Sequence, residues 1–482
     1  MPKHRSLRPA ARKARVTRRD VLLGAAAVAA QSVLPRDDSD ASRPNILIIY
    51  SDDQAPQTLG CYGNKRIRTP NLDKLAAQGL VCTRAYTPVP LCAPSRAALL
   101  TSTYPHESGV LRNKESAFDP QLPTFATHLR KAGYFCGLVG KWHLGDVPKP
   151  QAGFLDYWAA LDSDPASTPF AKRHMEPKVW KDGKLERHEA FATDVLTDYA
   201  LDFLRQRRDE KQPFLLWVAY RCPHFPFVAP PNTALHYQKK DLRLPPSSKD
   251  DLAKKPVFQA DDAMHRNYLA ADEDTLLEQL GLYYSMIGSI DSNVGRLLSA
   301  LDDGKPARPT LVLFSTDNGW LFGEHQLYGK GAAMYDELVR VPLLFRWPGK
   351  IAPGRTTDAL ISTMDLFPTF ASIAGTRPPN GLRGMDLLPL FEDRARTVHD
   401  ELFFEYDKGE TDNYPAPMLA VMTPRFKLNR YLKNGEEEMY DLVKDPAEMT
   451  NLIDQDSFAD DRKKLRERLD DFKNRIEIPY WK

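Results

Sequence analysis

The sequence predicts an α/β fold in which a large, mostly parallel mixed sheet is flanked by helices and followed by a smaller C-terminal α+β subdomain. Three observations predict this fold. Continuous apolar, β-branched runs have the composition of strands that are buried on both faces. Helical patterns lie between these runs, and this alternation is typical of layered folds with a parallel sheet. After about Gly375 the pattern changes to short strands and one amphipathic helix.

The elements can be placed in order along the chain. The expected strands of the large sheet are residues 45–50, 134–139, 214–220, 311–314 and 342–345. The expected helices are residues 71–78, 95–101, 124–131, 189–207 and 275–301. A breaker cluster at 376–381 precedes the C-terminal strands, which are expected at 402–405, 418–422, 427–431 and 438–442, and a helix at 458–476. Residues 241–274 are rich in Lys, Asp and Pro and are expected to form surface loops.

Length and charge limit the class of protein. The 482 residues are 27% charged and 42% apolar, which excludes a disordered tail, a disulfide mini-protein and a coiled coil. Residues 1–34 contain eight basic residues and one acid, so the rest of the chain is mildly acidic although the formal net charge is +2. We therefore expect no nucleic-acid-binding face on the folded part. The expected division is a leader at 1–34, a catalytic domain at 44–375 and a C-terminal subdomain at 376–482.

The leader has the three parts of an export signal: a basic start, an apolar run at 21–30 and small residues at 27–29. Residues 17–22 resemble a twin-arginine signal, which predicts the bacterial export machinery as a partner and a periplasmic or extracellular location. A basic arm that binds an anionic surface is the alternative. No other stretch is long and apolar enough for a membrane span, so we expect no transmembrane anchor.

The five cysteines form no CxxC pair, which argues against a zinc ribbon or a thioredoxin-like site. Five is an odd number, and if four of them pair, three connectivities are open. The cysteines are Cys61, Cys82, Cys92, Cys136 and Cys222.

Acidic turns follow two of the strongest strand candidates. Asp52 and Asp53 come after the first strand, and Asp317 and Asn318 come after residues 311–314. Ligands bind at the carboxyl ends of the strands in open α/β sheets, and four oxygen-bearing side chains there suit Ca²⁺ or Mg²⁺. The alternative for each turn is a turn former or a helix cap.

The segment Cys92-Ala93-Pro94-Ser95-Arg96 resembles the C-x-P-S-R signature of the type I, formylglycine-dependent sulfatases, which belong to the alkaline-phosphatase-like superfamily. The resemblance implies that a formylglycine-generating enzyme oxidises Cys92 to 3-oxoalanine (formylglycine). The alternative is an unmodified buried cysteine before a helix that starts with proline.

The resemblance also implies a mechanism and a cofactor. One hydroxyl of the hydrated aldehyde attacks sulfur and expels the alcohol, and loss of the proton from the second hydroxyl releases sulfate. One Ca²⁺ per chain would be held by Asp52, Asp53, Asp317, Asn318 and the modified Cys92. A hard cation held by oxygen ligands also agrees with the chemistry of the side chains.

Further motifs of the family follow in order, and each implies a role. Arg96 would orient the diol, and Lys141 and Lys330 would neutralise sulfate oxygens. His143, in a G-K-W-H-x-G element, would accept a proton, and His224, in a P-H-x-P segment, would help to protonate the leaving oxygen. Taken singly, Lys141 or Lys330 could be a surface lysine, and His143 or His224 could be a structural histidine. Further candidates for contact with substrate are His106, Arg112, Asn113 and His325.

The leading hypothesis is hydrolysis of a sulfate monoester, on a carbohydrate or another sulfate ester. A phosphate or phosphonate ester hydrolase on the same scaffold is the alternative among enzymes. A binding protein that has lost catalysis is the alternative from a different class, but Cys92, Lys141 and His143 are all retained.

Overall fold

The computed structural model describes residues 43–114, 118–162, 172–231, 237–304, 306–407, 417–478 and 481. The expected leader at 1–34, with its export signal and twin-arginine motif, lies outside the described residues. From residue 43 onward, the described residues belong to one compact unit. Within these segments, no helix combines the length and the apolar character that crossing a membrane requires.

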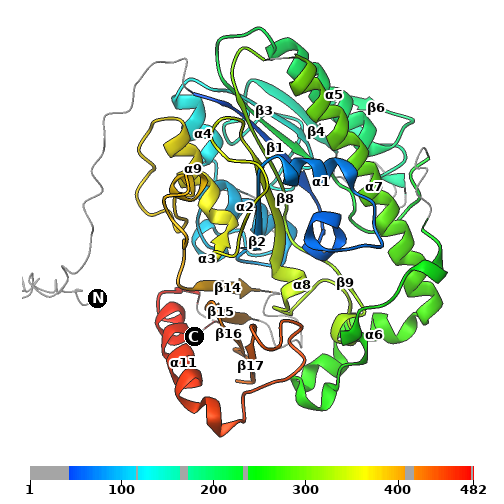
Figure 1. Cartoon of the computed structure of the whole chain (residues 1–482), viewed down its shortest axis with the longest axis vertical. Coiled ribbons are helices and arrows are strands. Elements are labelled where there is room, and N and C mark those ends of the chain that lie inside the picture. The colour runs from blue at the N-terminus through cyan, green and yellow to red at the C-terminus, as the bar shows by residue number, and fades with distance from the viewer. Residues whose placement is uncertain are drawn as a thin grey trace, which may run out of the picture. The chain divides into compact units, whose positions relative to one another are not determined.

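Eleven strands of the described segments form the main sheet, in the order β12-β2-β11-β8-β1-β7-β3-β4-β5-β6, with β13 paired to β2. Figure 1 shows this sheet running through the middle of the compact unit. Its strands are β1 (Asn45–Ser51), β2 (Leu80–Tyr86), β3 (Phe135–Gly140), β4 (Tyr157–Leu161), β5 (Lys178–Lys181), β6 (Lys184–Arg187), β7 (Phe214–Ala219), β8 (Thr310–Thr316), β11 (Arg340–Arg346), β12 (Arg355–Thr357) and β13 (Ile361–Ser362).

The centre of the sheet is parallel: β8, β1, β7, β3 and β4 run in one direction. Strand β11 is antiparallel to both β8 and β2, which makes the sheet mixed. All seven residues of β1 are buried, as a strand covered on both faces requires. The predicted mostly parallel mixed sheet is confirmed. Sequence reasoning did not predict β2, because Thr83 and Arg84 interrupt its apolar run.

Helices cover both faces of the sheet, and alternate residues of each strand face different helices. Ile46 and Ile48 pack in one core with residues of α2, α4 and α9. Leu47 and Ile49 pack in a second core with residues of α1, α5 and α7. The helices are α1 (Pro70–Ala77), α2 (Cys92–Thr101), α3 (Pro105–Ser108), α4 (Phe125–Lys131), α5 (Ala192–Arg207), α6 (Ala263–Ala270), α7 (Glu273–Gly304), α8 (Asp336–Val339), α9 (Leu366–Ile373), α10 (Leu388–Phe391) and α11 (Ala459–Lys473).

The C-terminal part contains a smaller antiparallel sheet in the order β14-β15-β16-β17, as expected. Helix α11 lies beside this sheet (Figure 1). Its Leu465, Leu469 and Phe472 pack into a core with residues of β15, β16 and β17. The strands are β14 (Leu402–Tyr406), β15 (Met418–Met422), β16 (Phe426–Tyr431) and β17 (Glu437–Asp441). A separate short hairpin joins β9 (Leu321–Phe322) to β10 (Tyr328–Gly329).

The prediction of surface loops at 241–274 was wrong in part. This segment contains several 3₁₀ turns and helix α6, and it has buried polar residues. Gln259 donates a hydrogen bond to the backbone of His325, and Lys255 donates one to the hydroxyl of Tyr440. Its Lys- and Asp-rich composition hid these contacts because their partners lie far away in the sequence.

Candidate active site

The predicted site residues converge at one edge of the main sheet. Asp52 and Asp53 follow β1, Lys141 follows β3, and Asp317 follows β8. These strands are parallel, so their carboxyl ends meet at the same edge. Cys92 is the first residue of α2 and is fully buried at this edge.

The Cys92 thiol lies among charged groups. Its Sγ is 3.5 Å from Asp52 Oδ1 and 3.8 Å from Asp53 Oδ1, and Lys330 Nζ lies 2.6 Å from it. Burial raises the pKa of the thiol, although the charges of Lys141 and Lys330 act in the opposite direction. All five cysteines are free thiols in the structure, so it contains no disulfide framework.

The serine of the signature fastens helix α2 to the end of β8. Ser95 Oγ donates a hydrogen bond of 2.7 Å to the backbone oxygen of Asp317 and accepts one of 2.8 Å from Thr87 Oγ1. The first turn of the helix is held from another side, because Ala93 N donates to Asn113 Oδ1 at 2.9 Å. These bonds fix where Cys92 lies relative to the strand ends.

Arg96 links two of the strand ends from inside the core. Its Nε and Nη2 lie 3.0 and 2.9 Å from Asp317 Oδ2, and Nη1 donates to the backbone oxygen of Lys141 at 2.9 Å. The guanidinium lies 5.3 Å from the centre of the Tyr50 ring, and the side chain is fully buried. Arg96 therefore supplies a fixed positive charge below the site.

Lys141 is positioned by the glycine before it. Gly140 has a φ of 111°, and a Cβ there would lie 2.0 Å from the backbone oxygen of Ala219, so only glycine fits. The Lys141 backbone then donates to the same oxygen at 2.8 Å. Its Nζ reaches Asp52 Oδ2 at 2.5 Å.

Several buried oxygens in the site have no hydrogen-bond donor among the described residues. They include Asp53 Oδ2 and Asn318 Oδ1, while Asn318 Nδ2 donates to Asp53 Oδ1 at 2.7 Å. One potential ligand atom each from Asp52, Asp53, Cys92 and His224 lies within 4.8 Å of the others. Oxygen atoms that are buried and unpartnered suit a hard divalent cation, so the residues present fit Ca²⁺.

Lys330 provides a second ammonium group at the same carboxylates. Its Nζ pairs with Asp53 Oδ1 as well as with Cys92. Burial works against its charge, but Asp53 and Cys92 raise the pKa of Lys330 well above its usual value. Lys330 therefore stays charged at neutral pH.

The two histidines lie beside these cations. His143 has a φ of 63°, and its Nδ1 is buried without a partner among the described residues. Burial, Lys141 and Arg96 hold the pKa of His143 well below its usual value, so the ring is neutral. His224 Nε2 lies 3.7 Å from Asp53 Oδ2, and burial lowers the pKa of His224 to about 4.

The candidates for substrate contact have different surroundings. Asn113 contacts the first turn of α2, as described above. The Arg112 side chain pairs with Asp407 Oδ2 at 2.7 Å, and His106 Nδ1 lies 2.6 Å from Glu405 Oε2. Arg112 and His106 therefore contact β14 and the residue that follows it, in the C-terminal sheet.

His325 is fully buried and does not reach the surface. Its Nδ1 lies 2.7 Å from Asp250 Oδ2, and its ring stacks on Tyr335 at 3.8 Å between centroids. His325 therefore packs inside the protein, against the segment that was expected to be a surface loop.

Sequence reasoning missed two residues close to the site. His174 Nε2 donates a hydrogen bond of 2.9 Å to the backbone oxygen of His224, and Arg221 lies between β7 and the Pro223-His224 motif. The position of Arg221 just after a buried strand was a usable signal. His174 gave none, because its partner is fifty residues away.

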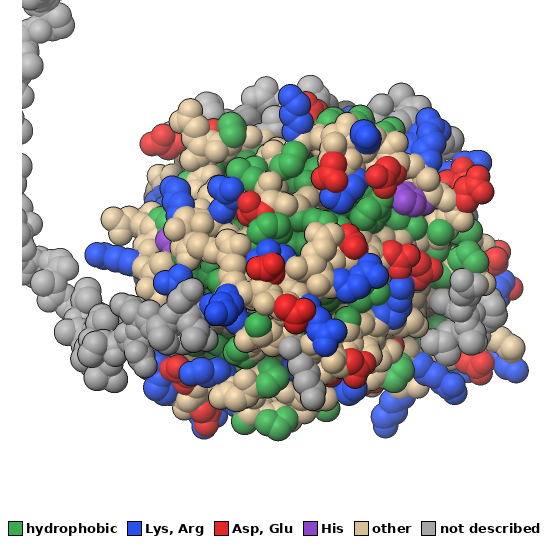
Figure 2. Space-filling view, turned by 90° about the horizontal axis from the view of Figure 1, so that it is seen from above, with side chains coloured by type: hydrophobic (Ala, Val, Ile, Leu, Met, Phe, Trp, Pro, Cys, Tyr) green, Lys and Arg blue, Asp and Glu red, His purple; other side chains and the backbone are tan. Residues whose placement is uncertain are grey.

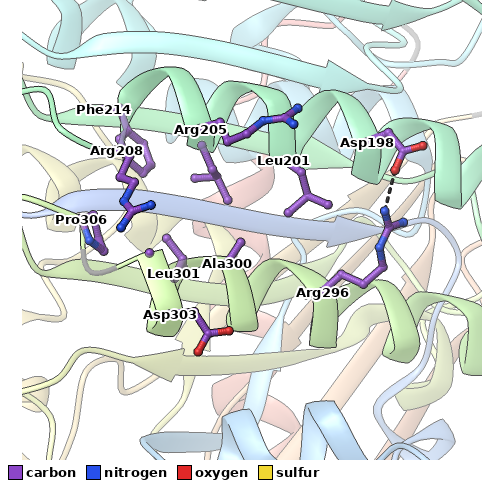
Figure 3. A pocket seen from close by; sticks show the side chains of 12 residues that line it. Asp198, Leu201, Arg205, Arg208, Phe214, Arg296, Ala300, Leu301, Asp303 and Pro306 are labelled. Atoms are coloured by element: carbon purple, nitrogen blue, oxygen red, sulfur yellow. Dashed lines mark hydrogen bonds and ion pairs between the residues drawn. The ribbon is translucent and has the colours of Figure 1, made fainter.

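A groove of about 550 Å³ lies elsewhere, between α5 and α7 (Figure 3). Phe214, the first residue of β7, lines it together with Arg296, whose side chain pairs with Asp198 at 2.6 Å. The site residues instead lie beyond the last residue of β7, so this groove is separate from them. On the face shown in Figure 2, basic and acidic side chains are interspersed.

Comparison with known proteins agrees with this arrangement. The sulfatase family model matches residues 44–376, and the model of the C-terminal region of N-sulphoglucosamine sulphohydrolase matches residues 323–475. The chain is 33% identical over 459 residues to the uncharacterized sulfatase YidJ of Escherichia coli K12, covering 91% of this chain and 88% of that protein. It is 28% identical to an N-acetylglucosamine-6-O-sulfatase of Bacteroides thetaiotaomicron, covering 94% and 90%.

Solved structures show the same fold. The structure of BT4656 in complex with its substrate D-glucosamine-2-N,6-O-disulfate has a TM-score of 0.79 and 26% identity, and the match covers 90% of this chain and 98% of that one. A family model that covers most of the chain, together with relatives of this similarity, identifies the protein as an enzyme that hydrolyses sulfuric esters. The chain belongs to the sulfatase family.

Proposed function

We propose that this protein hydrolyses sulfate monoesters on a carbohydrate, with Cys92 converted to formylglycine and one Ca²⁺ bound beside it. The observation that carries the proposal is the position of the Cys92 side chain. It lies within 4 Å of carboxylate oxygens of Asp52 and Asp53 and of the ammonium of Lys330. Cys92 therefore lies beside both the carboxylates proposed to bind the cation and an ammonium proposed to bind the sulfate group.

The ion would be held by Asp52, Asp53, Asp317 and Asn318, together with residue 92. When they are present, the hydrated aldehyde and Ca²⁺ supply an oxygen nucleophile of lowered pKa for attack on sulfur. The unpartnered oxygens of Asp53 and Asn318 support this assignment.

The lysines act on the charge of the substrate. Lys141 and Lys330 bring fixed positive charges to Asp52 and Asp53 at the carboxyl end of β1, where they would face the negative oxygens of a bound sulfate ester. Because both ammonium groups are largely buried, water screens them little, and they stabilise charge that develops during S–O cleavage. Arg96 keeps Asp317 in place beneath them.

The histidines carry the proton transfers. His143 is neutral, so it can accept the proton whose loss releases sulfate and restores the aldehyde. His224 is neutral in the substrate-free site, and the negative charge of a bound sulfate ester raises its proton affinity. The proposed role of His224 is to donate a proton to the leaving oxygen. His174 helps to position His224 for this role through the hydrogen bond to its backbone oxygen.

The substrate is proposed to be a sulfated sugar. Support comes from the N-acetylglucosamine-6-O-sulfatase relative and from the structure complexed with a glucosamine disulfate. Two glucosamine 6-sulfates therefore make suitable first substrates: one bears an N-acetyl group, and the other bears an N-sulfate.

A phosphonate ester hydrolase is the alternative on this scaffold. The phosphonate monoester hydrolase of Agrobacterium radiobacter has a TM-score of 0.74 at 23% identity, which is evidence for the fold alone. The family match favours sulfate esters over phosphonate esters as substrates. Turnover of 4-nitrophenyl sulfate, compared with turnover of 4-nitrophenyl phenylphosphonate, distinguishes the two activities. A catalytically lapsed binding protein would turn over neither ester.

The test uses full-length protein co-produced with a formylglycine-generating enzyme. Wild type is expected to release sulfate from the sulfated sugars and to prefer 4-nitrophenyl sulfate to the phosphonate. Cys92→Ala is expected to abolish turnover, while Cys136→Ala, which removes another buried thiol, retains it. A preference for the phosphonate, or full activity of Cys92→Ala, would overturn the proposal.

The remaining proposals concern maturation and organisation. The formylglycine-generating enzyme is the proposed maturation partner, and residues 1–34 are proposed to direct twin-arginine export to the periplasm or outside the cell. We place the catalytic domain at 44–375 and the C-terminal subdomain at 376–482. Sequencing the N-terminus of protein recovered from the periplasm tests the leader, because retention of residues 1–34 in a cytoplasmic product would contradict it.

A further inference from the structure

Arg221 is a buried arginine at the catalytic edge of the sheet that the proposed mechanism does not use. It follows β7, and its backbone oxygen accepts a hydrogen bond of 3.0 Å from the backbone of His224. The next residue, Cys222, accepts a hydrogen bond of 3.1 Å from the backbone of Asp52. Arg221 is therefore built into the backbone that connects two proposed catalytic residues.

Among the residues that the structure describes, the guanidinium of Arg221 has no counter-ion at contact distance. The residue is 7% exposed, and none of the residues that the structure describes gives its side chain a hydrogen bond or an ion pair. Its Nε is buried and finds no acceptor within the described segments. Arg96, the other arginine of this edge, differs because Asp317 pairs with it at 2.9 Å.

The surroundings of Arg221 disfavour its positive charge. Burial and the positive charge of Arg173 lower the pKa of Arg221 to about 10. The Asp52 carboxylate attracts it only from beyond ion-pair distance, and Lys141 already pairs with Asp52. A buried cation without a partner destabilises a fold, so such a residue is typical of a site whose partner is a ligand.

We propose that Arg221 binds a second oxyanion of the substrate, a sulfate or carboxylate group on the sugar beside the sulfate ester that is hydrolysed. The carboxylates of the catalytic edge already have Arg96, Lys141 and Lys330 as cations, so an additional anion finds Arg221 unoccupied. Arginine binds planar and tetrahedral oxyanions through two parallel hydrogen bonds. The inference rests on the proposed function and makes it narrower: the preferred substrates carry two anionic groups.

The test compares Arg221→Gln with wild type on the two glucosamine 6-sulfates. If the second oxyanion is a sulfate, wild type should have the higher kcat/KM for the N-sulfated sugar, and Arg221→Gln should lower the ratio of the two kcat/KM values by on the order of thirtyfold. Arg221→Lys should lower it less, because the charge remains. Arg205→Gln, which changes a side chain that is 76% exposed, should leave the ratio as in wild type.

A 6-sulfated disaccharide with a neighbouring uronate separates the two sources of the anion. If a carboxylate is the partner, Arg221→Gln lowers kcat/KM for the uronate substrate and leaves the ratio of kcat/KM between the N-sulfated and N-acetylated sugars unchanged. If a sulfate is the partner, Arg221→Gln lowers that ratio and leaves kcat/KM for the uronate substrate unchanged.

Thermal unfolding distinguishes a binding role from a structural one. Removing an unpaired buried charge should leave the Tm of Arg221→Gln equal to that of wild type or higher, whereas a structural role would lower it. The inference alone is overturned if wild type hydrolyses the sugars but Arg221→Gln changes none of these comparisons, or if the Tm falls and kcat/KM falls equally for all substrates. If wild type hydrolyses no sulfate ester, the proposed function and the inference fall together.

Discussion

Glu438 allows a stringent test of how the C-terminal sheet holds the catalytic segment. It lies on β17 and is fully buried. Its Oε1 accepts hydrogen bonds from the hydroxyls of Tyr335 at 3.0 Å and Tyr440 at 2.5 Å, and its Oε2 accepts one from Tyr431 at 2.5 Å. Tyr335 belongs to the segment that follows Lys330, so these bonds connect the small sheet to the active site.

The expected effect of Glu438→Gln follows from these three donors. The glutamine amide keeps the shape of the glutamate side chain but lacks its charge. Its NH₂ group cannot accept a hydrogen bond from the tyrosine hydroxyl that it faces. Hydrogen bonds to a charged group contribute about 1.5–3 kcal/mol each, and neutral ones about 1 kcal/mol. We therefore expect a loss of about 3 kcal/mol in the free energy of unfolding, and a fall in Tm on the order of 5 °C.

A double-mutant cycle isolates the bond to the catalytic segment. Tyr335→Phe removes one hydroxyl, and its effect should be smaller in the Glu438→Gln background, with a coupling of about 1.5 kcal/mol. Urea unfolding measures all four proteins, and Glu401→Gln, on a side chain that is 32% exposed, should change stability by less than about 0.5 kcal/mol. Additive effects, or a Glu438→Gln protein as stable as wild type, would show that Glu438 does not hold Tyr335 through this hydrogen bond.

Three other predictions concern the site itself. Lys330→Met removes the ammonium beside Cys92 that is proposed to bind the sulfate group, and it should lower kcat/KM by about 10²–10³; steady-state kinetics with less than a tenfold loss would contradict this role. Because burial and neighbouring cations depress the pKa of His143, this proposed proton acceptor stays neutral in mild acid. The kcat/KM should therefore fall only below the ordinary histidine range of about pH 6.5, and a kcat/KM–pH profile whose acid limb is centred at or above that value would be inconsistent. Thorough chelation should abolish turnover and lower Tm, and added Ca²⁺ should restore both. If the chelator changes neither activity nor Tm, and no metal is detected in the protein, the proposed Ca²⁺ site is contradicted.

The fold and most of the site could be predicted from the sequence because the signals were local. The run at 45–50 is apolar at every position, so a strand buried on both faces was the natural interpretation, and Asp52 and Asp53 necessarily follow its end. The signature around Cys92 is contiguous, and the glycine before Lys141 marks a close backbone approach.

What could not be predicted depends on partners that are distant in the sequence. The buried turns at 241–274 look polar until Asp250 is seen to pair with His325 and Lys255 with the backbone of Glu448. The unpaired state of Arg221 is likewise a property of three-dimensional packing, since no sequence pattern shows that a counter-ion is missing among the described residues.

The most direct test of the account is peptide mass spectrometry across Cys92, on protein co-produced with a formylglycine-generating enzyme and assayed on sulfate esters from the same preparation. We expect an aldehyde in place of the thiol at residue 92, and sulfate release that rises in proportion to the converted fraction. An unmodified Cys92 thiol in protein that hydrolyses sulfate esters at full rate would contradict it.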